Sequence, residues 1–67
     1  MNMSEAREAV QPFINSKNAA EYMLETDKAL WVESTIMAPA GINSSICTDF
    51  GETLCNYIEN QFQGGDE

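Results

Sequence analysis

The stretch Leu30–Ala38 has apolar residues at both ends and polar residues in the middle, and it contains the sole tryptophan of the chain. An extended backbone would separate two sets of side chains: Leu30, Val32, Ser34, Ile36 and Ala38 on one face, and Trp31, Glu33, Thr35 and Met37 on the other. Alternation with a period of two, together with β-branched and aromatic residues, predicts a β-strand. Because neither face is fully polar, we expect one to pack on the protein's own core and the other on a partner.

A second strand is predicted from Ser44 to Phe50. Pro39 ends the first strand because proline cannot donate a hydrogen bond to a sheet. Residues 40–43 then supply a turn, since Gly41 and Asn43 tolerate positive φ. The two strands would pair as a β-hairpin.

Two short helices are predicted before the first strand. Ser4 is expected to cap the first helix. Its apolar face follows helical spacing at Ala6, Ala9, Val10, Phe13 and Ile14. Pro12 removes a backbone donor, so this helix is expected to kink or end near Gln11.

The second helix is expected to run from about Ala19 to Thr26. Asn18 followed by Glu21 three residues later approximates a capping box. Three apolar side chains are expected to face inward, with Tyr22 to one side: Ala20, Met23 and Leu24.

A third helix is predicted over Glu52–Phe62, capped by Thr48 or Asp49. One helical stripe holds Leu54, Ile58 and Phe62, with Cys55 and Gln61 beside it. A strand is the alternative, but it would place Asn56 and Asn60 on the apolar face, so the helix is favoured. Gly64 and Gly65 would end this helix.

The predicted order is therefore helix, helix, strand, strand, helix. This order indicates an α+β fold in which about three short helices pack on a small antiparallel sheet. A chain of 67 residues forms one domain, residues 1–67, and residues 1–3 and 64–67 are expected to be flexible at its ends.

The charge of the chain is strongly unbalanced. Eleven acidic residues stand against three basic ones, there is no histidine, and the net charge is −8. No basic residue follows Lys28, which leaves six carboxylates without a local counter-charge: Glu33, Asp49, Glu52, Glu59, Asp66 and Glu67. Such a chain repels nucleic-acid phosphates and attracts basic partners. The alternative is that its acidity only keeps a small protein soluble.

Catalytic chemistry finds little support in these residues. Histidine, the usual general acid or base, is absent, so no serine or cysteine has an imidazole to activate it. Asp49 with Glu52 offers a weak site for a hard cation, but capping of a helix explains the pair better. We therefore expect a protein that is not an enzyme and that needs no cofactor or metal, with no membrane partner.

Cys47 and Cys55 are the only cysteines, and their spacing fits no zinc-binding pattern. We expect both thiols to be free and buried in a reducing, cytoplasmic setting, although a disulfide between them is the alternative. No apolar run resembles a signal peptide or a membrane span, which agrees with that location.

The face of the predicted strand that carries Trp31 has two interpretations. A carboxylate and a hydroxyl, Glu33 and Thr35, lie between an aromatic ring and the flexible Met37, as in the centre of a protein interface. Alternatively, Trp31 and Met37 are core residues beneath the helices and Glu33 lies at an edge.

Carboxylates on helices can also imitate the phosphates of DNA. Residues four apart on a helix rise by about 6 Å, which is comparable to the spacing of phosphates along a strand. The pairs Glu5 with Glu8 and Glu21 with Glu25 approach this spacing. The alternative is that these pairs only form solvated helix faces.

The segment Glu33–Pro39 resembles the phage-encoded uracil-DNA glycosylase inhibitors. In that family a strand carries Glu-Ser, two apolar positions and then Met-x-Pro. The matching residues here are Glu33, Ser34, Met37 and Pro39, with Ile36 as a conservative match. The family is also small and acidic, and its α+β fold places two helices on an antiparallel sheet. In the family an acidic helix follows the proline, whereas this sequence predicts a turn and a strand.

The resemblance implies a DNA-mimicking inhibitor of uracil-DNA glycosylase, an enzyme that flips its target base out of the duplex. It implies that Glu33 and Ser34 contact the enzyme. By position, Met37 would line an apolar pocket that receives a leucine of the enzyme. From the expected packing, further apolar residues would complete this pocket: Ile36, Met23, Leu24, Ile58 or Phe62. The acidic contribution of the family's helix would come from Asp49, Glu52 or Glu59.

The leading hypothesis is thus an inhibitor that binds a basic DNA-binding protein, uracil-DNA glycosylase, in the host cytoplasm of a phage. One alternative is another phage anti-defence protein, either anti-CRISPR or anti-restriction, with a different basic target. Others are a small structural or dimerisation module and a small regulatory subunit.

Overall fold

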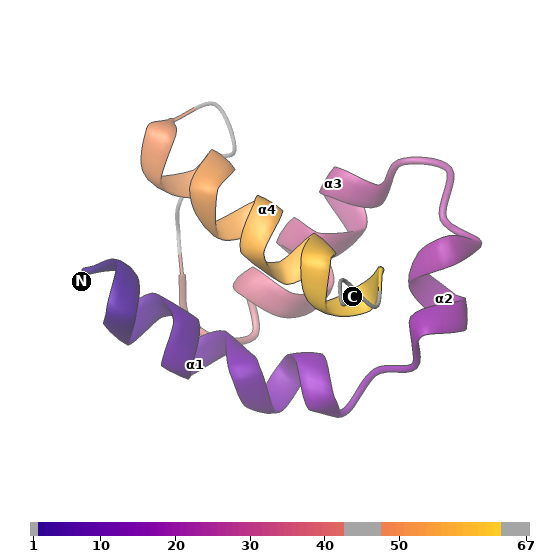
Figure 1. The fold of residues 1–67 in the computed structure, drawn as a ribbon, viewed down its shortest axis with the longest axis horizontal. Coiled ribbons are helices and arrows are strands. Elements are labelled where there is room, and N and C mark those ends of the chain that lie inside the picture. Colours follow the sequence, from indigo (N-terminus) through magenta and orange to yellow (C-terminus); the bar gives the residue numbers. More distant parts are fainter. Residues whose placement is uncertain (1, 43–47, 64–67) are drawn as a thin grey trace.

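The computed structural model describes residues 2–42 and 48–63. This part of the chain folds into helices α1 (Met3–Asn15), α2 (Ala19–Met23), α3 (Lys28–Val32) and α4 (Asp49–Phe62), with a π-helical segment, η1 (Glu33–Met37), directly after α3 (Figure 1). No strand occurs in these residues, so the predicted α+β fold with a small antiparallel sheet is wrong. The fold of the described residues is helical.

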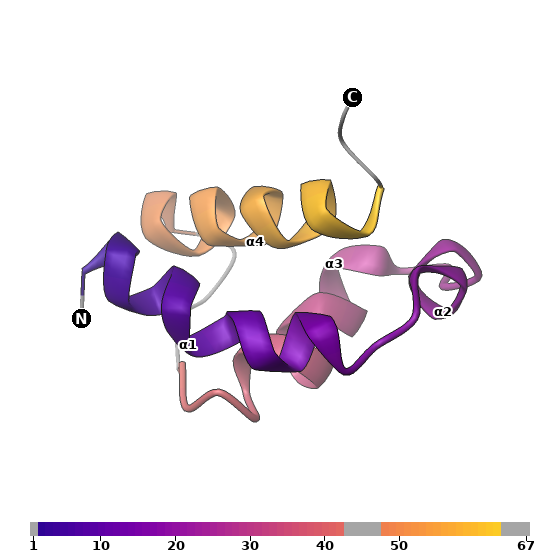
Figure 2. The ribbon, with the colours of Figure 1, turned by 60° about the horizontal axis from the view of Figure 1, so that its bottom comes forward.

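The two long helices, α1 and α4, pack against each other and run in roughly the same direction, as two views show (Figure 1, Figure 2). Their N-terminal ends therefore lie at the same end of the molecule. The short helices α2 and α3 lie toward the other end, where both contact α4. The segment η1 then leads back beneath α1.

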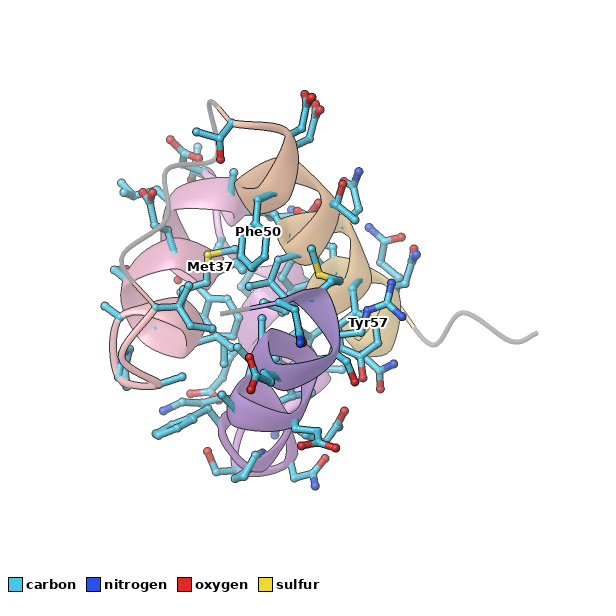
Figure 3. All side chains as sticks on the ribbon, turned by 90° about the vertical axis from the view of Figure 1, so that its left-hand side faces the viewer. Met37, Phe50 and Tyr57 are labelled. Atoms are coloured by element: carbon cyan, nitrogen blue, oxygen red, sulfur yellow. The ribbon has the colours of Figure 1, made fainter. Side chains whose placement is uncertain are left out.

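The core lies between α1, α4 and the η1 segment. Its buried side chains come from every helix of the described residues: Ala6, Val10, Ile14, Tyr22, Val32, Ile36, Met37, Ile42, Leu54, Cys55, Ile58 and Phe62. Met37 and Phe50 both point into this core, one from η1 and the other from the first turn of α4 (Figure 3). The predicted inward faces of α1 and α4 are confirmed, because both helices bury their apolar stripes.

The predicted strand Leu30–Ala38 is a helix instead. The Asp27 side chain caps α3 by accepting a hydrogen bond from the Leu30 N–H over 3.1 Å. In η1 the Ala38 N–H donates to the Glu33 carbonyl five residues earlier, over 2.9 Å. A turn that closes over five residues places Val32 and Met37 on the same side, where both are fully buried. The segment thus buries its apolar residues with a helical rather than a two-residue period.

The second predicted strand, Ser44–Phe50, lies largely outside the described residues, and its described end is also helical. Thr48 is the N-cap of α4 and accepts a hydrogen bond from the Gly51 N–H over 3.0 Å. Asp49 and Phe50 form the first turn of the helix rather than the end of a strand. The predicted third helix and its cap at Thr48 are confirmed. Gly41 has a φ of 81°, as the predicted turn requires.

Helix α1 begins earlier and ends later than the sequence predicts. Its N-cap is Asn2 rather than Ser4, and Asn2 forms a reciprocal capping box with Glu5. Pro12 lies inside the helix, which continues to Asn15. The turn beyond Pro12 buries Ile14, and this burial offsets the missing backbone donor. Of the two predicted outcomes, an end of the helix near Gln11 is therefore wrong.

Helix α2 is capped as predicted but turns a different face inward. Asn18 and Glu21 form the capping box. Tyr22, expected to one side, is the buried residue of this helix, with an exposed fraction of 1%. Met23 and Leu24, expected inside, are 57% and 84% exposed. The prediction of the inward face is therefore wrong.

Candidate functional site

Carboxylates are the predominant charged groups on this molecule. Six of the nine acidic side chains in the described residues are exposed: Glu5, Glu8, Glu21, Asp27, Asp49 and Glu52. Three are half-buried: Glu25, Glu33 and Glu59. Glu5 and Asp49 lie in the first turns of α1 and α4, which begin at the same end of the molecule (Figure 2).

Two of the three basic side chains are directed toward aromatic rings. The Arg7 guanidinium carbon lies 4.8 Å from the centre of the Tyr57 ring, between α1 and α4. The Lys28 ammonium lies 5.7 Å from the centre of the Tyr22 ring and donates to the Glu25 carbonyl over 3.0 Å. Within residues 2–42 and 48–63 both cations therefore contact rings or a carbonyl rather than a carboxylate, and the chain as a whole keeps a net charge of −8.

Two of the predicted site residues, Glu33 and Glu59, act electrostatically on Cys55. The Cys55 thiol is free and buried in the core face of α4. Burial, and then the negative charges of Glu59 and Glu33, raise the pKa of this thiol to about 11. The two carboxylates thus act on one buried group from different elements, η1 and α4.

A short chain of hydrogen bonds extends from Glu59. Its Oε2 accepts from the Tyr22 hydroxyl over 3.0 Å, and that hydroxyl accepts from Gln63 Nε2 over 3.1 Å. Burial raises the pKa of Tyr22, and the hydrogen bond to Glu59 adds to this increase, whereas Gln63 opposes it. These contacts join α2 to the C-terminal end of α4.

Trp31 belongs to an aromatic cluster rather than to a free face. Its ring lies edge-on to Phe62, with 5.3 Å between ring centres, and edge-on to Tyr22 at 5.9 Å. Tyr22 in turn stacks on Phe62 with a separation of 5.5 Å. Of the two interpretations open from the sequence, this geometry agrees with a role for Trp31 in packing.

The remaining predicted contact residues differ in their accessibility. Ser34 is exposed, and its hydroxyl donates back to the Leu30 carbonyl over 2.9 Å. Ile36 and Met37 have exposed fractions of 0% and fill the core, so they do not line a surface pocket. Ile58 and Phe62 are buried as well, whereas Met23 and Leu24 lie outside.

Asp49 and Glu52 form a separate acidic site in the first turn of α4. Carboxylates at this position interact favourably with the helix dipole. Glu59 lies two turns further along, at a rise of about 10 Å from Glu52. The structure therefore does not gather the predicted acidic residues into one cluster.

Sequence reasoning missed one feature, the exposed apolar side chains of α2 and α3. Met23, Leu24 and Leu30 are the large hydrophobic residues that the described part of the chain leaves exposed. The signal available in the sequence was Tyr22, because only one side of a short helix can face the core. In the folded chain Tyr22 takes that side, because its ring stacks on Phe62 and its hydroxyl donates to Glu59.

Within residues 2–42 and 48–63, no three acidic or cysteine side chains are grouped so as to hold a metal ion. No helix in these residues has the length and apolar character needed to cross a membrane. Comparisons with protein-family models, with curated proteins and with solved structures give no match to this chain.

Proposed function

We propose that this chain is a protein inhibitor, without enzymatic activity, that binds a basic DNA-handling protein in the cytoplasm of a bacterial host. The observation that carries this proposal is the uncompensated charge of the exposed carboxylates. Arg7 and Lys28 contact aromatic rings, and six carboxylates are exposed, three of which (Glu5, Glu21 and Asp27) also accept a backbone hydrogen bond at the start of a helix. Groups of carboxylates on helices can occupy the sites that DNA phosphates would otherwise fill.

Uracil-DNA glycosylase is the first target to test, because Glu33–Pro39 resembles the phage-encoded inhibitors of that enzyme. In that family a strand contacts the enzyme, but this mode of contact cannot apply to the present chain, since Glu33–Met37 is π-helical here. What supports the proposal is charge together with the accessible Ser34 and half-buried Glu33. Ile36 and Met37 are not part of it, because both are buried.

A uracil-excision assay tests the proposed target. Equimolar addition of this chain should abolish excision from a uracil-containing duplex, and rising salt should relieve the inhibition because it screens exposed charges. Undiminished excision at molar excess would exclude the glycosylase. Capture of a different DNA-handling protein from bacterial lysate, with loss of its DNA binding, would instead support an anti-CRISPR or anti-restriction role.

Charge variants test the mechanism separately from the target. The double substitution Asp49→Asn and Glu52→Gln removes two exposed charges from the first turn of α4 and should weaken the complex. The matched control is Asn56→Gln, an exposed and uncharged position on the same helix. Equal affinity of both variants would show that this part of the acidic surface lies outside the interface.

A further inference from the structure

The exposed large apolar side chains of the described residues are concentrated in one short stretch, between residues 23 and 30. Met23 and Leu24 at the end of α2 are 57% and 84% exposed, and Leu30 in α3 is 56% exposed. Single exposed apolar residues are ordinary, whereas contiguous apolar patches mark contact surfaces. We call these three residues and the turn between them the α2–α3 hairpin.

The orientation of these side chains follows from what their neighbours bury. Tyr22 occupies the inward side of α2, which directs the next two residues outward. In α3, Trp31 packs in the aromatic cluster and Val32 is buried in the core. Leu30, the residue before them, therefore faces away from the core. Met23, Leu24 and Leu30 are therefore exposed because their neighbours occupy the inward side of each helix.

Contacts made by Tyr22 of α2 and by Lys28 of α3 hold the α2–α3 hairpin in place. The Tyr22 hydroxyl bonds to Glu59 of α4, and its ring stacks on Phe62. Lys28 closes the turn by donating to the Glu25 carbonyl while its ammonium lies over the Tyr22 ring. A surface that is already ordered loses little conformational entropy when a partner binds.

The charges around the exposed apolar residues select the kind of partner. Glu21, Glu25 and Asp27 lie in the same stretch, and its basic residue, Lys28, is engaged by Tyr22. A second copy of this chain would bring the same carboxylates together at a net charge of −8 each, which disfavours self-association. An anionic membrane surface would be repelled for the same reason.

We propose that the α2–α3 hairpin docks an amphipathic helix of a partner protein, one whose apolar stripe is flanked by Lys and Arg. Leu24, Met23 and Leu30 would contact the apolar stripe, and the carboxylates of Glu21, Glu25 and Asp27 would face the flanking cations. In such a contact the apolar side chains would supply affinity and the surrounding charges selectivity. The inference rests on the proposed function in one respect, that the partner is basic.

A peptide-binding experiment tests this inference on the full chain. The probe is a synthetic peptide of leucine and lysine arranged as an amphipathic helix, and the control peptide has the same composition with its leucines spread around the helix. Calorimetric titration should show tighter binding of the amphipathic probe. Equal affinity for both peptides would indicate attraction by charge alone and would overturn the inference.

Variants then locate the surface. The triple substitution Met23→Ser, Leu24→Ser and Leu30→Ser should reduce probe affinity by about tenfold or more, since anchors at the centre of an interface dominate binding. The matched control, Ala38→Ser, changes an exposed apolar residue outside the hairpin and should have no effect. Circular dichroism checks that the variants keep their helices. Unchanged affinity of the folded triple variant would overturn the inference, as would a dimer of the unmodified chain in sedimentation that this variant dissociates.

The same variant separates this inference from the proposed function. Amphipathic-probe binding that depends on the hairpin, without inhibition of any DNA-handling protein, would support the docking surface and refute the inhibitor role. Inhibition that the triple variant retains in full, together with undiminished probe binding by that variant, would support the inhibitor role and refute the docking surface.

Discussion

The Tyr22 hydroxyl donates a hydrogen bond to Glu59 Oε2 over 3.0 Å and so joins the short helix α2 to the C-terminal half of α4. The residues are 37 positions apart in the chain. A helix of five residues is too short to be stable alone, so this contact and the stacking of Tyr22 on Phe62 hold α2 in place.

Loss of this hydroxyl should lower stability while leaving the ring packing intact. Tyr22→Phe is expected to reduce the free energy of unfolding by about 1 kcal/mol, because the Glu59 carboxylate loses a partly buried donor. Urea denaturation followed by circular dichroism measures this change. Tyr57→Phe is the matched comparison, since it removes the 2.7 Å hydrogen bond from the Tyr57 hydroxyl to Gln11 Oε1. A Tyr22→Phe variant as stable as the unmodified chain would contradict this role.

Cys55 should be a poor nucleophile in the folded protein. Its pKa of about 11, raised by burial and by Glu59 and Glu33, leaves about a hundredfold less thiolate at pH 8 than an ordinary value of 9.0 would. In a Cys47→Ser background, iodoacetamide should label Cys55 slowly in buffer and rapidly in urea.

The same shift predicts how stability depends on pH. A thiol that binds its proton more tightly in the folded state contributes its full stabilisation below pH 9 and loses it as pH rises from about 9 to about 11. The free energy of unfolding of the Cys47→Ser chain should therefore fall over this range. Cys55→Ala should remove this component of the decline, and an identical pH profile in that variant would contradict the assignment.

Pro12 should destabilise the helix that contains it. Pro12→Ala restores a backbone N–H for the carbonyl of Glu8 and removes no buried side chain, because Pro12 is exposed. We expect an increase of roughly 1–3 kcal/mol in the free energy of unfolding, measured by urea denaturation. Glu8→Ala, an exposed position on the same helix, should change stability by only a few tenths of a kcal/mol. A destabilised Pro12→Ala variant would instead indicate a break in α1.

Met37 and Leu24 offer a direct comparison of the inside and outside of the fold. Met37→Ala should cost about 2–5 kcal/mol, because the side chain is fully buried between η1 and α4. Leu24→Ala should change stability by less than about 0.5 kcal/mol, since its side chain is 84% exposed. Thermal melting of the two variants measures the difference. Similar melting temperatures would contradict the helical packing described above.

The local sequence was sufficient to predict an element wherever its pattern fits one secondary structure better than any other. The stripe of Leu54, Ile58 and Phe62 has helical spacing and a threonine cap, and α4 has that face buried and Thr48 as its N-cap. Asn18 with Glu21 likewise predicts the start of α2. Caps and amphipathic stripes involve residues within one or two turns of each other, so they can be recognised without knowledge of the rest of the chain.

The candidate site was predicted less well than these elements. The sequence indicated an acidic surface and named Glu33 and Glu59, which act electrostatically on the same buried thiol. It did not indicate that Ile36 and Met37 are inaccessible, or that Leu24 is exposed. Accessibility depends on which elements cover a residue, and that information is not local.

The residues alone therefore established the acidic charge, the caps of α2 and α4 and the apolar stripes of α1 and α4. The secondary structure of Leu30–Ala38 required the folded chain, because its residues are compatible with both structures: a mostly apolar set at alternate positions for a strand, and Val32 with Ile36 for a helix. Packing between α1 and α4 favours the helix, since it buries Val32, Ile36 and Met37 together, whereas a strand would place Met37 on the opposite face. Tertiary contacts also decided that Tyr22 rather than Leu24 faces inward, because Glu59 and Phe62 of α4 supply the partners that a tyrosine needs.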